Sequence, residues 1–160
     1  MAKLPEGLNI EWTASDTDRP AHPSNVRLHD YYLAKKPADG LPGRADFDLL
    51  DLYDIAPGLF IIEQDPDNRG GIRYRLVGSD IEARLGISLT GRGTGAFTEP
   101  VSERLQALYE DIFTNQTIHI LRGRFVGSGI EHVDYESFLL PMRARDGHSV
   151  NIIGGMFAFD

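Results

Sequence analysis

IRYRLVGSDIEARLGISLTG (residues 72–91) is the stretch that decides the fold, because it indicates a strand, a turn and a short helix in succession. Its first six residues alternate and are rich in β-branched and aromatic side chains, as in a strand. Gly78 ends the strand. Ser79 and Glu82 then have the spacing of a capping box, in which each side chain accepts a hydrogen bond from the backbone amide of the other. We expect Gly86 to end the helix, because glycine adopts the left-handed conformation without strain.

The composition predicts one globular domain and excludes several functions. Of 160 residues, 41% are hydrophobic and 25% are charged, which is enough to build a core. The net charge of -8 disfavours nucleic acid and anionic membrane surfaces, which both attract basic proteins. The absence of cysteine excludes disulfides, thiolate metal ligands, thiol nucleophiles and cysteine-linked chromophores. Because no segment resembles a secretion signal or a membrane span, we expect a cytoplasmic protein.

The chain is expected to divide at Ser24. Residues 1–23 are rich in Pro, Asp, Ser and Thr and are predicted to be a flexible leader, and residues 24–160 to be a single domain. A weak alternation within the leader is compatible with a short edge strand through Leu8, Ile10 and Trp12.

Two longer helices and five strands are expected in the domain. Ser24 is placed to cap a helix over residues 25–36, which Pro37 ends. Residues 101–115 follow a 3.6-residue apolar period after a proline, as in a helix with one buried face. The strands are expected at residues 59–64, 72–77, 118–126, 132–145 and 148–159.

The last three strands are expected to form a meander. If Val126 pairs with His132, two cross-strand pairs of opposite charge form, Arg122 with Glu136 and Arg124 with Asp134. Each pair contributes about 0.2–1 kcal/mol. The other face then mixes apolar and small residues, so it either accepts a helix or leaves space for a ligand. Asp146-Gly147 is the favoured two-residue turn into the last strand.

The last strand is predicted to lie in the middle of the sheet, bonded to residues 59–64. It is apolar on both sides, with Ile153, Phe157 and Phe159 on the side away from the meander's apolar face. We expect either the helix over residues 25–36 or a second copy of the chain to cover that side.

No catalytic or metal site is predicted. The glycine-rich loop at residues 89–96 has neither the lysine of a phosphate loop nor the context of a dinucleotide fingerprint, so it is interpreted as a connection. The histidines lack metal-ligand spacing, and G-x-S-x-G is absent. His119 falls on the pocket face, where it either contacts a ligand or is a satisfied structural histidine.

Three short motifs occur in a fixed order. Together with the order of the expected helices and strands, they indicate a resemblance to a known protein family. They are Leu41-Pro42-Gly43-Arg44-Ala45-Asp46, Tyr74-Arg75-Leu76-Val77-Gly78 and Leu89-Thr90-Gly91. From about His29 to the C-terminus, the chain resembles the PAS fold, and more specifically a group of short stand-alone bacterial PAS-type proteins.

This resemblance implies an α+β fold: a five-stranded antiparallel sheet with helices packed on one face and an N-terminal helix. It also implies a small-molecule cavity, a homodimer and a signalling role through a separate output protein. The lack of cysteine excludes a cysteine-bonded flavin or chromophore, and no helix histidine near the cavity is expected to ligate haem. The cofactor is therefore left open.

The preferred function is a non-catalytic sensory domain that binds a small molecule between the sheet and the helices. The predicted ligand-binding residues are Tyr74, Leu76, Phe97, Tyr109, Phe113, His119, Leu121, Tyr135, Ser137 and Met156. One alternative is a dimerisation or protein-interaction module with a filled core. Another is a small isomerase or hydrolase, which requires a buried acid–base pair in the cavity.

Overall fold

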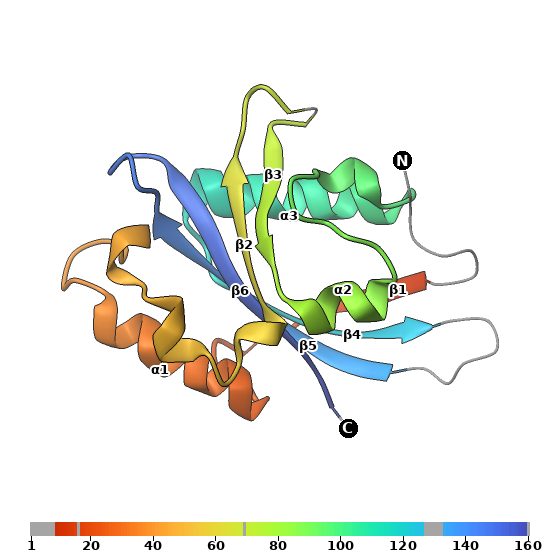
Figure 1. Cartoon of the computed structure of the whole chain (residues 1–160), viewed down its shortest axis with the longest axis horizontal. Helices are drawn as coiled ribbons and strands as arrows, with labels where there is room; N and C mark the ends of the chain where they lie inside the picture. Colours follow the sequence, from red (N-terminus) through yellow and green to blue (C-terminus); the bar gives the residue numbers. More distant parts are fainter. Residues whose placement is uncertain (1–8, 16, 69, 127–132, 160) are drawn as a thin grey trace.

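The structure is a computed structural model that describes residues 9–15, 17–68, 70–126 and 133–159. These residues form one antiparallel sheet of six strands in the order β1-β4-β5-β6-β2-β3, together with three α-helices (Figure 1). The strands are β1 (Asn9–Ala14), β2 (Leu59–Gln64), β3 (Ile72–Val77), β4 (His119–Val126), β5 (Val133–Arg143) and β6 (Val150–Ala158). The helices are α1 (Pro23–Lys35), α2 (Ser79–Leu85) and α3 (Val101–Asn115), with short 3-10 turns η1 (Arg44–Asp46), η2 (Leu49–Leu52), η3 (Ala56–Gly58) and η4 (Thr94–Ala96).

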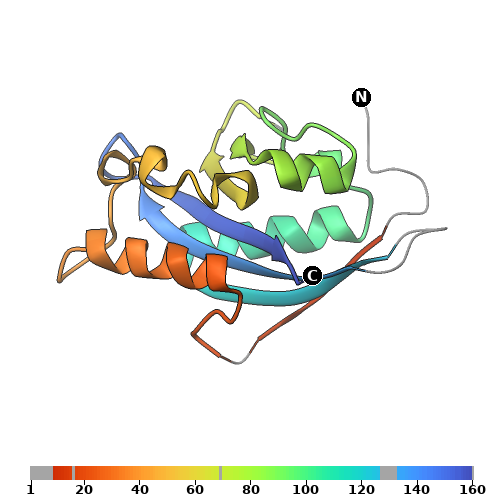
Figure 2. The same ribbon diagram turned by 60° about the horizontal axis from the view of Figure 1, so that its bottom comes forward.

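The sheet separates two hydrophobic cores. Helices α2 and α3 pack on one face, whereas α1 and the turns that follow it pack on the other (Figure 2). The PAS-like arrangement predicted helices on one face of the sheet only, and the structure corrects this, because helices lie on both faces. The helix over residues 25–36 was also a candidate to cover the second side of the last strand, and α1 provides that cover. Within the described ranges, no helix combines the length and apolarity needed to cross a bilayer.

Strand β6 lies in the middle of the sheet, as predicted. It pairs with β5 on one side and with β2 on the other. Ile152 faces the α2–α3 core and Ile153 faces the α1 core, and both are fully buried. An apolar residue on each side is what a strand covered by helices on both faces requires.

The predicted register of the meander is confirmed for the described residues. Arg122 pairs with Glu136 and Arg124 with Asp134. The predicted pairing of Val126 with His132 falls outside the described residues. The turn before β6 differs from the prediction, because Ala144 N donates to Ser149 O and closes a four-residue loop. The two-residue Asp146-Gly147 hairpin is therefore wrong.

The expectation of five strands is corrected by β1. Residues 9–14 were assigned to the leader, yet all six of them pair with residues 121–126 of β4. Gly123 allows this close approach, since a Cβ there would lie 2.1 Å from Glu11 O and 2.7 Å from the Tyr135 hydroxyl. The first element is consequently a strand, and α1 follows it.

Both predicted N-caps are wrong. Helix α1 begins at Pro23, and the His22 ring, not Ser24, caps it by accepting a hydrogen bond from Ser24 N at 3.1 Å. Gly78 is the N-cap of α2, so no capping box forms there. The Glu82 carboxylate instead accepts a hydrogen bond from Leu89 N at 2.6 Å and holds the loop that follows α2.

The end of α2 is as predicted. Gly86 adopts the left-handed conformation with φ 74°, and its amide donates to Glu82 O at 2.8 Å. A residue with a Cβ would be strained in this conformation.

Candidate functional site

A cavity of about 70 Å³ lies between the sheet and the helices α2 and α3. This volume exceeds the roughly 10–15 Å³ that one water needs, and it is far below the roughly 300–1,000 Å³ of sites for drug-sized ligands. Its walls come from all six strands, α2, α3 and the segment between these helices. The lining comprises Ile10, Trp12, Phe60, Tyr74, Val77, Ile81, Leu85, Leu89, Phe97, Val101, Leu105, Leu108, Tyr109, Leu121, Tyr135, Ser137, Leu139 and Met156.

No charged side chain lines the cavity. Its polar groups are three phenols, one serine hydroxyl and the indole of Trp12. An ion placed there would lose its hydration without gaining a counter-charge, which is very costly. The cavity therefore suits an uncharged, largely apolar molecule.

Tyr74 and Tyr109 form a buried pair across the cavity wall. Their hydroxyl oxygens are 2.8 Å apart, and their rings meet edge to face at a centroid distance of 6.0 Å. Burial raises the pKa of both phenols well above the usual value. Both hydroxyls thus stay protonated and act as neutral hydrogen-bond donors.

The backbone around Tyr74 is held by the loop that follows α2. Tyr74 N donates to Arg92 O at 2.8 Å, and Gly91 N donates to Tyr74 O at 2.7 Å. The glycine-rich segment thus pairs with the outer edge of β3. This contact places the Tyr74 ring firmly at the cavity wall.

Helix α3 is tied to the same region by Gln106. Its amide nitrogen donates to Gly70 O at 2.7 Å, and its amide oxygen accepts from the Thr94 hydroxyl at 2.7 Å. These bonds join α3 to the β2–β3 hairpin and to the glycine-rich loop, and they orient the face that carries Tyr109.

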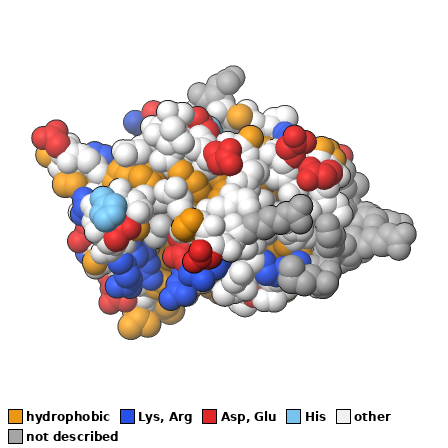
Figure 3. All heavy atoms as spheres, turned by 90° about the horizontal axis from the view of Figure 1, so that it is seen from above, with side chains coloured by type: hydrophobic (Ala, Val, Ile, Leu, Met, Phe, Trp, Pro, Cys, Tyr) orange, Lys and Arg blue, Asp and Glu red, His pale blue; other side chains and the backbone are white. Residues whose placement is uncertain are grey.

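The open groove over the glycine-rich loop is not a phosphate site. Three carboxylates line it, from Glu99, Glu103 and Glu110, against the single guanidinium of Arg92, so the net negative charge of its lining would repel a phosphate. Acidic and basic side chains are interspersed on the face of the molecule shown in Figure 3, so no broad basic surface occupies that side. The interpretation of residues 89–96 as a connection agrees with this chemistry.

The floor of the cavity is formed by alternate residues of β5. The Tyr135 hydroxyl donates to Glu11 O at 3.4 Å, and the Tyr135 ring packs against Phe125 with 4.8 Å between centroids. Ser137 is only 7% exposed, and its hydroxyl forms no hydrogen bond with another described residue. Ser137 thus presents a hydroxyl to the cavity that is not used within the described part of the chain.

Seven of the ten predicted ligand-binding residues line the cavity: Tyr74, Phe97, Tyr109, Leu121, Tyr135, Ser137 and Met156. The other three, Leu76, Phe113 and His119, lie outside it. Phe113 packs against the α2–α3 core without reaching the cavity.

Leu76 is turned away from the cavity by an irregularity in the pairing of β3. Ile61 pairs with Leu76 and Ile62 with Tyr74, so Arg75 has no partner in β2. This extra residue reverses the alternation. Leu76 then packs against the α1 core, and Val77 lines the cavity in its place.

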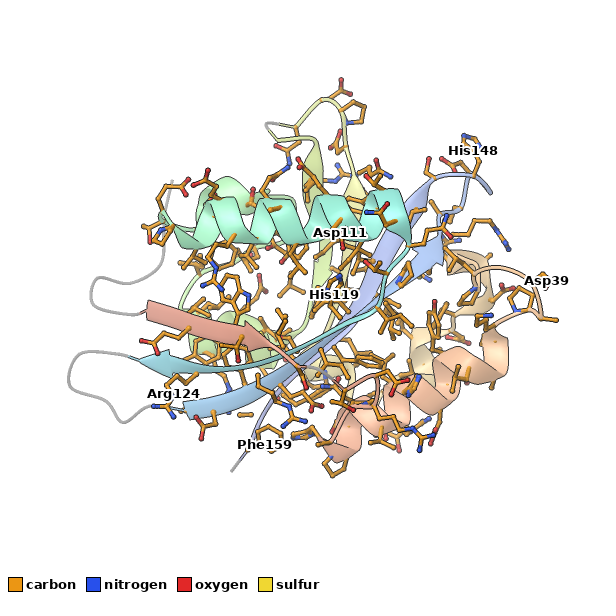
Figure 4. The ribbon with its side chains drawn as sticks, turned by 180° about the vertical axis from the view of Figure 1, so that it is seen from behind. Asp39, Asp111, His119, Arg124, His148 and Phe159 are labelled. Atoms are coloured by element: carbon orange, nitrogen blue, oxygen red, sulfur yellow. The ribbon has the colours of Figure 1, made fainter. Side chains whose placement is uncertain are left out.

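His119 is a structural residue at the start of β4. Its Nε2 atom lies 3.1 Å from the Asp111 carboxylate and 2.9 Å from the Thr117 hydroxyl. Figure 4 shows His119 beside Asp111 on α3. Hydrogen bonds from Asn115, Thr117 and His119 lower the pKa of Asp111. His119 therefore joins β4 to the last turns of α3, which is the structural alternative left open by the sequence.

The residues that the prediction missed belong mainly to β1, α2 and α3. Trp12 and Ile10 line one wall, and the alternation in the leader was the available signal for them. Ile81 and Leu85 stand one helical turn apart on α2, a spacing that indicates a buried face. Leu105 and Leu108 belong to the apolar period of α3.

The cavity lining offers neither an imidazole that could ligate haem nor the carboxylate or histidine of a common acid–base pair. No histidine and no carboxylate lines it. Among the described residues, no group of three His, Asp or Glu side chains could hold a metal ion. The one fully buried carboxylate that the structure describes, Glu136, faces the α1 side and accepts hydrogen bonds from Ala21 N at 2.9 Å and His22 N at 3.0 Å.

A second hollow of about 180 Å³ adjoins the cavity beside α2. Its rim includes His22, Asp80 and Arg84. Both spaces are lined by Ile81, Tyr135 and Met156, so these side chains form the wall between them.

An antiparallel sheet that encloses an apolar cavity beneath short helices defines a class of sensory and interaction modules. A family model described as a PAS domain matches residues 20–157, and the chain belongs to this family. The predicted resemblance is thereby confirmed. Among curated proteins and solved structures, none matches the chain significantly.

Proposed function

We propose that this protein is a non-catalytic sensory domain that binds a small molecule in the cavity between the sheet and the helices α2 and α3. The observation that carries the proposal is an apolar space, lined in part by the Ser137 hydroxyl and the Tyr74–Tyr109 pair, within an otherwise well-packed core. Natural cores leave few voids, because each lost contact costs stability. Space of this kind is explained when a ligand completes the packing.

Helix α3 and strand β1 are the elements through which occupancy would be transmitted. The Arg104 guanidinium lies 4.1 Å from the centre of the Trp12 ring and donates to Trp12 O at 3.2 Å. A ligand that shifts α3 would therefore also move β1, which is at the edge of the sheet. The size of the response is limited by the ligand's differential affinity for the two arrangements.

Mass spectrometry of the purified protein tests the proposal. Native mass spectrometry of the purified protein, followed by extraction and identification of any bound molecule, should detect a small molecule. In Ser137→Leu, whose larger side chain fills the cavity, this molecule should be absent. Ser88→Leu is the matched control, because Ser88 is exposed in the loop after α2. If no molecule co-purifies and no compound in a metabolite library raises the melting temperature, the proposal is refuted.

A protein-interaction module is the second candidate function. Leu50 in η2 is 79% exposed and Tyr53 at its end is 76% exposed, and we propose both as contacts to a second copy or to an output protein. The apolar side of β6 is less available, because the His22 ring stacks on Phe157 at 5.1 Å and approaches Phe159 at 5.3 Å. Sedimentation velocity of the double variant Leu50→Ser/Tyr53→Ser and of the wild type measures whether these residues contact a second copy, through the fraction of dimer. An unchanged dimer fraction would reject these two residues.

A further inference from the structure

The Tyr74–Tyr109 pair contains one hydrogen more than the chain uses. In the bond between the two hydroxyls, one phenol donates and the other accepts. The accepting phenol keeps its own hydrogen, for which no described residue provides an acceptor. The two side chains are only 3% and 5% exposed, so the acceptor for this hydrogen has to be a molecule inside the cavity, either a water or a ligand.

An unused buried donor costs about as much as a lost hydrogen bond. Phenylalanine at both positions would fill the same space and remove the cost. The hydroxyls are therefore explained by an acceptor that is not part of the chain. Tyr74 comes from β3 and Tyr109 from α3, so such an acceptor would also bridge the sheet and the helix.

The charge of the cavity narrows the class of molecule. Because its lining has no cationic side chain, a carboxylate or phosphate would remain uncompensated. Because it also has no carboxylate, an amine would remain uncompensated. The raised pKa of both phenols keeps them neutral, so they donate to an acceptor and do not attract a cation.

We propose that the ligand is a small uncharged molecule, mostly hydrocarbon, with a carbonyl-type acceptor that takes the spare hydrogen of the Tyr74–Tyr109 pair. The inference rests on the proposed ligand-binding function and specifies its chemistry. The cavity of about 70 Å³ limits the molecule to a few heavy atoms or one small ring.

Three probes of similar size test the proposal: cyclopentanone, cyclopentane and cyclopentanecarboxylate. Dissociation constants are measured on the full chain from backbone amide chemical shifts. One neutral hydrogen bond contributes about 0.5–1.5 kcal/mol, so we expect cyclopentanone to bind about three- to tenfold more tightly than cyclopentane. We expect no binding of the carboxylate.

The tyrosine variants give a distinctive pattern. Tyr74→Phe and Tyr109→Phe should each keep the preference for the ketone, because the remaining phenol is then a free donor. The double variant should bind both neutral probes equally, and it should stay folded because both partners are replaced by rings of the same shape. Tyr32→Phe is the control, since Tyr32 is buried in the α1 core and its hydroxyl donates to Pro141 O.

The possible failures are distinguishable. Equal binding of the ketone and the hydrocarbon by the wild type, or a ketone preference that survives in the double variant, overturns the inference and leaves the cavity as a binding site. Tightest binding of the carboxylate overturns it as well. If no probe binds the wild type, the cavity does not admit small molecules, and the proposed function fails with it.

Discussion

Glu136→Gln should weaken the attachment of α1 to the sheet by a predictable amount. The Glu136 carboxylate is fully buried and accepts hydrogen bonds from Ala21 N, His22 N and the Asn25 side chain, and it pairs with Arg122 at 2.8 Å. These contacts fasten the segment before α1 to β5. They are the main polar link described between that segment and the sheet.

The magnitude follows from which contacts the amide loses. An amide oxygen can replace Oε1, which faces His22 N and Asn25. The amide nitrogen then replaces Oε2 and faces Ala21 N and the Arg122 guanidinium, so two charge-assisted bonds are lost. Each is worth about 1.5–3 kcal/mol, and the 40% exposure of Arg122 reduces its share. We expect a loss of about 3 kcal/mol in the free energy of unfolding.

Urea unfolding with amide hydrogen exchange over α1 measures this effect. The matched control is Asp134→Asn in the neighbouring pair on the same face, where Arg124 and Asp134 are 46% and 55% exposed. Exposed pairs contribute about 0–1 kcal/mol, so the control should cost at most that. If both variants cost the same, or if exchange in α1 is unchanged in Glu136→Gln, burial of this carboxylate does not anchor the helix.

Three further predictions concern β1, the hairpin and the cavity. Gly123→Val should release β1 and raise amide hydrogen exchange over residues 9–14, because the Cβ of the valine would lie 2.1 Å from Glu11 O. Gly95→Val is the control and should leave this exchange unchanged, because the space around Gly95 is open. Hydrogen bonds from the Ser149 hydroxyl and backbone lower the pKa of Asp146 to about 2, so Ser149→Ala should move this pKa toward 3.8 in a carboxyl NMR titration. Because the pKa of Asp146 is lower in the folded protein, the charged carboxylate stabilises the fold above pH 4, and this stabilisation disappears as the pH falls through 2. Leu139→Ala should enlarge the cavity, cost about 2–5 kcal/mol in urea unfolding and admit benzene, and a cost below 1 kcal/mol would contradict its place in the lining.

Local sequence patterns determined most of the elements of this protein. The apolar period of α3 and the continuous apolar run of β2 predicted both elements with the bounds that the structure has. The charges at Arg122, Arg124, Asp134 and Glu136 predicted the register of β4 and β5. These signals are readable because helix period, strand alternation and cross-strand charge depend on residues close in sequence or directly opposed.

The tertiary structure alone decided which residues face the cavity and what closes it. The unpaired Arg75 exchanges Leu76 for Val77 at the cavity wall, and no local pattern marks that position. Strand β1 acquires its place only when Gly123, more than a hundred residues away, leaves room for it. His119 turns to Asp111 because α3 ends beside the start of β4. Such contacts join segments far apart in the chain, so their energies belong to the packed arrangement and not to any one stretch of sequence.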